Sequence, residues 1–136
     1  MPLWVCAQQI TVPWQCGFED SAENSQWVLN PQTPNATDKW EIGSATYSEG
    51  SQSLYISTND GASAQYGANP DIVITYRKIR FPQKAGKYNI SFDWKSIGDT
   101  VRAKLYVCLL REDNLTRGFY TDNQGTSRGL LSLPEI

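Results

Sequence analysis

The chain has 136 residues, a formal net charge of -2 and no histidine. This length is sufficient for one domain with its own core. Without histidine, Ser-His and Cys-His nucleophile pairs are excluded, and the scattered lysines and arginines do not form the dense basic footprint of a nucleic-acid-binding protein. A calcium site with oxygen ligands and a pair of catalytic carboxylates remain compatible with the composition.

The N-terminal residues resemble the end of a secretory signal. Val5 and Ala7 occupy the small-residue positions of a cleavage site, and Gln8 would be the first residue after it. We therefore expect residues 1–9 to be a signal remnant or tail, residues 10–136 to form the domain, and the protein to be secreted or at the cell surface. No stretch reaches the ~20 apolar residues of a membrane span, so membrane insertion is not expected.

Short alternating segments in the first half of the chain predict strands. They are separated by turn residues, including Thr58-Asn59-Asp60-Gly61, which tolerate positive φ angles. Pro13 interrupts the first segment, which favours an edge or a bend, and the acidic residues 19–23 indicate a turn. The strands are expected over residues 10–18, 26–30, 39–43, 53–57 and 72–81.

The clearest pattern lies in residues 86–111. Tyr88, Ile90, Phe92 and Trp94 alternate with polar residues, and a second alternating run covers residues 101–109. Because side chains of a strand change face at every residue, we expect a hairpin of two half-buried strands whose apolar face is covered by a second sheet. No helix of three turns is expected, so the sequence predicts an all-β sandwich or barrel.

The three cysteines show no metal-binding or redox spacing. Cys108 is expected to be a small, buried or half-buried thiol within a strand. Cys6 and Cys16 would close a short loop in an oxidising environment, but their spacing alone does not establish a disulfide.

Several motifs, in this order, resemble the MAM domain and its bacterial relatives, the cleaved-adhesin and choice-of-anchor modules of secreted surface proteins. The resemblance spans roughly residues 16–111. It is based on Cys16-Gly17-Phe18-Glu19, Trp27, Lys39-Trp40-Glu41-Ile42, Gly50-Ser51-Gln52-Ser53-Leu54-Tyr55-Ile56, the run from Tyr88 to Trp94, and Lys104-Leu105-Tyr106-Val107.

The resemblance implies a jelly-roll β-sandwich of two antiparallel sheets and a non-enzymatic task outside the cell, such as adhesion or glycan binding. Two features depart from the family pattern. The cysteine that usually follows the Phe-Glu motif and pairs with the first one is missing, so no family disulfide is inferred for Cys16. The closing strands of the family would lie beyond Ile136, so the jelly roll is either incomplete at the C-terminus or closed differently.

Glu19 and Asp20 are candidate metal ligands. They directly follow a predicted strand, and the resemblance implies a structural calcium ion at the glutamate of the Phe-Glu motif, which is Glu19 here. Calcium takes six to eight oxygen ligands from carboxylates and carbonyls. The alternative is that Glu19 accepts hydrogen bonds from a neighbouring loop and holds no metal.

Aromatic side chains in or beside loops are the candidate ligand-binding residues, because a flat ring can stack on the apolar face of a sugar. These residues are Tyr47, Tyr66, Tyr120 and Trp40. For Trp27, Trp40, Phe92 and Trp94 the alternative is a place in the core.

We therefore expect a non-catalytic binding or adhesion module whose partner is a glycan or a surface protein. The alternative is a structural or assembly module, a homo-oligomer or a neighbour of another domain in a longer chain, that pairs through an open sheet edge. A glycoside hydrolase using Asp93 with Glu112 or Asp113 is a weaker alternative, because no motif supports the required carboxylate geometry.

Overall fold

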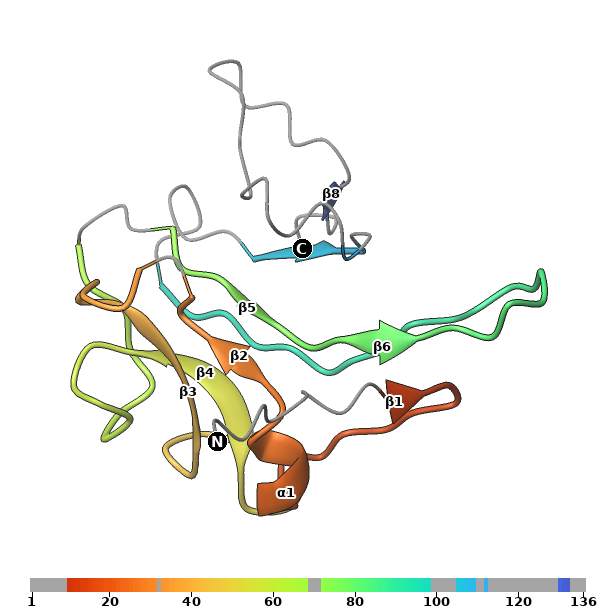
Figure 1. Ribbon diagram of the computed structural model, residues 1–136. Coiled ribbons are helices and arrows are strands. Elements are labelled where there is room, and N and C mark those ends of the chain that lie inside the picture. The colour runs from red at the N-terminus through yellow and green to blue at the C-terminus, as the bar shows by residue number, and fades with distance from the viewer. Residues whose placement is uncertain are drawn as a thin grey trace, which may run out of the picture. The chain divides into compact units, whose positions relative to one another are not determined.

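The computed structural model describes residues 10–31, 33–68, 72–98, 105–109, 112 and 130–132 (Figure 1). The chain divides into two units, Met1–Asp93 and Trp94–Ile136, which are described separately. The described residues are mostly strands and loops with one short helix, so the all-β prediction is confirmed. No helix among them is long and apolar enough to cross a membrane.

The first unit is centred on an antiparallel hairpin of β3 (Lys39–Gly43) and β4 (Ser53–Ser57). Both strands have the predicted bounds, and in their ladder Lys39 pairs with Ser57 and Gly43 with Ser53. Directly paired residues of an antiparallel ladder share a face. One face therefore carries Tyr55 and Ser57, which are both buried, and the other carries Trp40, Ile42, Leu54 and Ile56, which are half-buried.

The turn that follows β4 covers the Tyr55 face. The Ser57 hydroxyl donates to Asn59 Oδ1 at 2.8 Å and accepts the backbone N–H of Gly61 at 3.0 Å. The Tyr55 hydroxyl donates to the Gly61 carbonyl at 2.7 Å. Asp60 and Gly61 both have positive φ, so the turn predicted from Asn59, Asp60 and Gly61 is confirmed.

The hairpin is also tied to a second strand pair, β2 (Val28–Leu29) with β5 (Thr75–Tyr76), which is antiparallel. Asn30, directly after β2, accepts the backbone N–H of Trp40 at 2.8 Å and donates to the Trp40 carbonyl at 3.0 Å. The indole N–H of Trp40 donates to the Val73 carbonyl at 3.0 Å. Trp40 therefore ties β3 both to the residue that follows β2 and to a residue that precedes β5.

The remaining strands are short. β1 (Ile10–Thr11) pairs in parallel with β6 (Ile79–Arg80), and α1 (Ser21–Asn24) lies between β1 and β2 in the sequence. In the second unit, β7 (Tyr106–Cys108) pairs antiparallel with β8 (Leu130–Ser132).

Cys16 and Cys108 carry free thiols, and partial burial raises the pKa of Cys108. The half-buried thiol predicted for Cys108 is confirmed.

The predicted strands 10–18 and 72–81 are shorter than expected. The first is a strand only at Ile10–Thr11, and Pro13 follows immediately. The second is divided into β5 and β6 because the chain changes partner there, from β2 to β1. Between them, the Arg77 side chain is only 3% exposed and forms an ion pair with Glu23.

The predicted central hairpin is wrong in the residues that the structure describes. Residues 81–98 contain no strand, and the aromatic side chains of Phe92 and Trp94, expected in the core, are exposed. β7 pairs with β8 and not with this segment. The alternation correctly identified an extended segment with one apolar face, but no second layer covers that face among the described residues.

Asn30 provides a test of the link between β2 and β3. It has a left-handed φ of 51° and makes two hydrogen bonds to Trp40. Asn30→Ala should lower the free energy of unfolding by roughly 2–4 kcal/mol, because it removes both bonds and places a Cβ-bearing residue without a local hydrogen bond at positive φ. Urea denaturation measures this loss.

Asn30→Gly is the matched control, because glycine also lacks the amide but adopts positive φ without strain. We expect it to be less destabilising than Asn30→Ala, the reverse of the usual order of these two residues. If Asn30→Gly lowers the free energy of unfolding as much as Asn30→Ala or more, the left-handed backbone at this position does not contribute to the effect.

Candidate functional site

The candidate site is the loop between β3 and β4, residues 44–52, which a carboxylate anchors at its base. Glu19 Oε1 accepts the backbone N–H groups of Ser51 at 2.7 Å and Gln52 at 2.8 Å. Glu19 Oε2 accepts the Ser51 hydroxyl at 2.6 Å. Both oxygens of the carboxylate are therefore used to hold the last residues of the loop.

Local backbone geometry brings Glu19 to this position. Phe18 has a φ of 63°, which turns the chain immediately before the glutamate. Gly50 has a φ of 71°, and a Cβ on it would collide with the Glu19 carboxylate. The carboxylate can approach the backbone of the loop because the residue before Ser51 has no side chain.

Hydrogen bonding lowers the pKa of Glu19 below its ordinary value of 4.5. The Ser51 hydroxyl is the largest cause, the backbone N–H groups of Ser51 and Gln52 add to it, and slight desolvation opposes it. Donors directed at a carboxylate stabilise its charged form. Glu19 is therefore held ionised and in place although it is exposed to water.

Asp20 has a different role from its neighbour. Its side chain accepts the backbone N–H of Ala22 at 2.9 Å and forms the N-cap of α1. A side-chain oxygen at this position satisfies one of the free N–H groups at the start of a helix. The structure therefore places helix capping at Asp20, and the acidic turn expected at residues 19–23 is a short helix.

These contacts bear on the predicted calcium site. The groups around Glu19 are N–H and O–H donors, whereas calcium takes oxygen ligands. Within the described ranges, no group of three acidic or cysteine side chains could hold a metal ion. The described arrangement corresponds to the loop-binding alternative for Glu19. Calcium binding stays a prediction.

Tyr47 and Tyr66 are exposed, as expected, with 54% and 38% of their surface accessible. Tyr47 lies in the anchored loop, next to Thr46, whose carbonyl accepts the Ser53 hydroxyl. Tyr66 lies at the other end of the hairpin, where Gln65 N–H donates to the Ile56 carbonyl at 3.0 Å. The structure does not bring the two rings together.

The other two predicted ligand-binding residues differ from them. Trp40 is half-buried, and its indole N–H is engaged by Val73, so it contributes to the packing of β3. Tyr120 lies outside the described residues. Of the four aromatic residues, Tyr47 is therefore the most exposed ring that the described structure offers to a ligand.

Two contacts of α1 were not predicted from the sequence. The Asn24 amide donates to the Phe18 carbonyl at 2.7 Å and to Gln52 Oε1 at 3.3 Å, so it links α1 to the anchored loop. Arg77 forms two bonds with Glu23, at 2.9 and 3.2 Å. The sequence signal for the helix was present, because an acidic N-cap at Asp20 followed by Glu23 is typical of a helix start.

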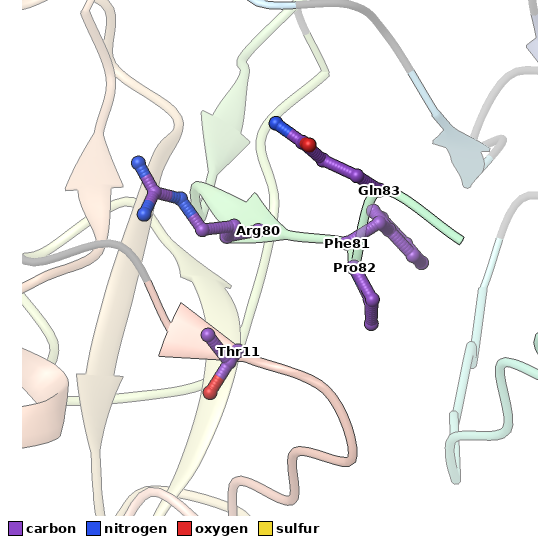
Figure 2. A pocket seen from close by; sticks show the side chains of 5 residues that line it. All are labelled: Thr11, Arg80, Phe81, Pro82 and Gln83. Carbon is purple, nitrogen blue, oxygen red and sulfur yellow. The ribbon is translucent and has the colours of Figure 1, made fainter.

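A separate hollow lies beside the β1–β6 pair. It has a volume of about 480 Å³ and is lined by Thr11, Arg80, Phe81, Pro82 and Gln83. Figure 2 shows Thr11 on β1 and the other four side chains on β6 and the residues after it. The lining combines one cation with two apolar side chains.

No protein-family model matches the chain, and the chain has no match among the curated proteins or the solved structures. The resemblance to MAM and cleaved-adhesin modules stays a prediction.

The pH dependence of stability tests the Glu19 anchor. Because its folded pKa is lowered, Glu19 contributes stability above its ordinary pKa of 4.5, and this contribution is lost as the pH falls through the folded pKa. Glu19→Gln should therefore melt at a lower temperature than the natural chain at neutral pH. The difference should shrink as the pH falls below about 4.5.

Glu49→Gln is the control. It also removes one negative charge, but Glu49 is an exposed residue of the loop and forms no hydrogen bond in the described structure. Thermal melts of the three proteins across acid and neutral pH give the comparison. A difference between Glu19→Gln and the natural chain that stays constant with pH would contradict the anchoring role of the ionised carboxylate.

Gly50→Ala tests the close approach of the loop to Glu19. The added Cβ meets the carboxylate and the residue must keep a positive φ, so we expect a lower melting temperature. Gly17→Ala is the matched control, because a Cβ there has its nearest neighbour, Glu19 Cγ, at 4.0 Å. Equal effects of the two substitutions on the melting temperature would contradict the packing described here.

Proposed function

We propose that this chain is a non-catalytic extracellular module that binds carbohydrate or another cell-surface ligand, with a jelly-roll β-sandwich as its architecture. The resemblance to MAM and cleaved-adhesin modules supports the architecture, the location outside the cell and the class of function. The antiparallel pairs β2–β5 and β3–β4 are compatible with such a sandwich.

The observation that carries the binding proposal is the position of Tyr47. Its ring is 54% exposed on a loop whose base is fixed by the Glu19 carboxylate and by the Ser53 hydroxyl. A loop that is already anchored loses less backbone conformational entropy when a ligand stacks on its ring. Tyrosine also offers a hydroxyl beside its apolar face, which suits the mixed surface of a sugar.

The separation of Tyr47 from Tyr66 restricts this proposal. β3 and β4 each have five residues and rise by about 3.3 Å per residue, so the two ends of the hairpin are about 13 Å apart. One sugar ring stacks on one aromatic ring. Tyr47 is therefore the primary platform, and Tyr66 would act only as a second one.

Tyr47→Ala is expected to weaken binding to a glycan found in an array screen of the whole chain by about tenfold or more. Tyr47→Phe should keep most of the affinity, because it preserves the ring. Tyr66→Ala should have a smaller effect than Tyr47→Ala on a monosaccharide ligand. Calorimetry with the selected sugar measures all three.

A well-folded chain that binds no glycan in the screen would contradict carbohydrate as the ligand. Equal affinity of Tyr47→Ala and the natural chain would contradict the position of the site.

A second candidate function is assembly with another protein surface, and one observation favours it. Within the described part of the first unit, exposed apolar side chains recur in residues 81–93, including Tyr88, Ile90 and Phe92. Exposed apolar side chains gathered in one segment are typical of interaction sites. This role is compatible with carbohydrate binding, because the two use different parts of the first unit.

A further inference from the structure

Residues 87–93 form an extended segment that pairs with no strand in the described part of the chain. Tyr88, Ile90 and Phe92 are exposed by 43%, 50% and 43%, and the polar residues between them are exposed as well. No backbone hydrogen bond of this segment occurs in the described part of the chain. Its N–H and C=O groups are therefore open to pairing, as in the edge strand of a sheet.

The segment is held at its start by contacts of its own arm. Figure 1 draws it as the return limb of a long arm, whose outgoing limb contains β6. The rings of Phe81 and Tyr88 pack edge to face with their centres 4.8 Å apart. The Tyr88 hydroxyl approaches the Lys84 carbonyl at 3.5 Å. These contacts hold residues 81–88 together at the turn of the arm, so the extended segment that follows starts from a defined position.

In an antiparallel pairing of two copies, the side chains of residues 87–93 face chemically complementary side chains of the same segment. If two copies pair antiparallel with Ile90 opposite Ile90, then Tyr88 lies opposite Phe92 and Lys87 lies opposite Asp93. Symmetry repeats each of these pairs, so the dimer has two aromatic pairs and two ion pairs. Opposite charges and aromatic rings directly across an antiparallel ladder are stabilising pairs.

The two kinds of pair fall on different faces. Tyr88, Ile90 and Phe92 lie on one face of the extended strand, and Lys87 and Asp93 lie on the other. Pairing two copies therefore brings apolar side chains together on one face and opposite charges together on the other. All five side chains are exposed in the single chain, so none has to leave a buried position to pair.

Neighbouring registers lose these pairs. A shift that places Asn89 opposite itself sets Lys87 opposite Ser91 and leaves Asp93 opposite Ala85. The shift in the other direction sets Lys87 opposite Lys95, and like charges directly across a ladder are destabilising. Shifts by a single residue place apolar side chains opposite polar ones. The register centred on Ile90 is the one that charge and polarity favour together.

We propose that residues 87–93 pair antiparallel with the same segment of a second copy of this chain, with Ile90 on the two-fold axis and Lys87 against Asp93 of the partner copy. This inference rests on the assembly role proposed above and names its partner and register. It is independent of carbohydrate binding at Tyr47. The pairing is isologous, so it ends at a dimer.

Charge reversal tests the register in the whole chain. Lys87→Glu and Asp93→Lys should each weaken dimerisation by about tenfold, because each places two like-charge pairs across the ladder. An equimolar mixture of the two variants should form a mixed dimer as strong as the natural one, since every pair in it is again of opposite charge. The double variant Lys87→Glu/Asp93→Lys should also recover.

Lys84→Glu is the matched control, because it changes the same charge on the same arm but lies opposite an uncharged serine in this register. Sedimentation equilibrium up to millimolar concentration measures the dissociation constants, and circular dichroism checks that every variant is folded. A small strand interface is weak, so the high concentration is required.

The possible results distinguish a failure of the proposed register from a failure of the assembly role. If the natural chain is a strict monomer at every concentration, both the self-pairing and the assembly role with a second copy are overturned. If the chain dimerises but Lys87→Glu behaves like Lys84→Glu, or if the mixed variants fail to recover, assembly stands and the register proposed here is wrong. Loss on single reversal with recovery in the mixture supports the inference.

Discussion

The carboxylate of Glu19 joins two segments that are 32 residues apart in the sequence. It does so with three hydrogen bonds to Ser51 and Gln52, and Asn24 adds a fourth link from α1 to the same loop. Bonds to an ionised acceptor are stronger than bonds between neutral groups. The loop that carries Tyr47, the start of β4 and the helix are therefore positioned by one small network of polar contacts.

Polar contacts have a large part throughout the described structure. Tyr55 is the one large apolar side chain that is buried among the described residues, and it is covered by a turn that Ser57 and Asn59 organise. Asn30 and Trp40 tie the hairpin to β2 and β5 in the same way. Such bonds specify geometry well but each contributes only about 1 kcal/mol to stability. The exposed apolar side chains of residues 81–93 would therefore add hydrophobic stabilisation only when another surface covers them.

The sequence was sufficient to predict the features that depend on neighbouring residues. β3 and β4 follow from local alternation, the turn after β4 follows from Asn59, Asp60 and Gly61, and the exposure of Tyr47 and Tyr66 follows from their polar neighbours. These properties are local because side-chain period and backbone preference are set within a few residues.

Features that depend on a distant partner were not predicted correctly. The alternation in residues 88–94 shows that one face is apolar, but it contains no information on whether another sheet covers that face. For the same reason, residues 72–81 read as one strand, although Arg77 pairs with Glu23 at a point where the chain changes from one strand partner to another. The role of Glu19 required knowledge that Gly50 lies beside it.

The two proposed surfaces of the first unit would reinforce one another. A single aromatic platform gives weak affinity for a sugar, because one stacked ring contributes little binding free energy. A dimer formed through residues 87–93 carries two Tyr47 loops. Binding of the second loop to a surface that displays many copies of the sugar would then be an intramolecular step, which raises the overall affinity without any new contact. Self-pairing through the arm is thus a physical means by which a small module with a weak site can adhere to a repetitive surface.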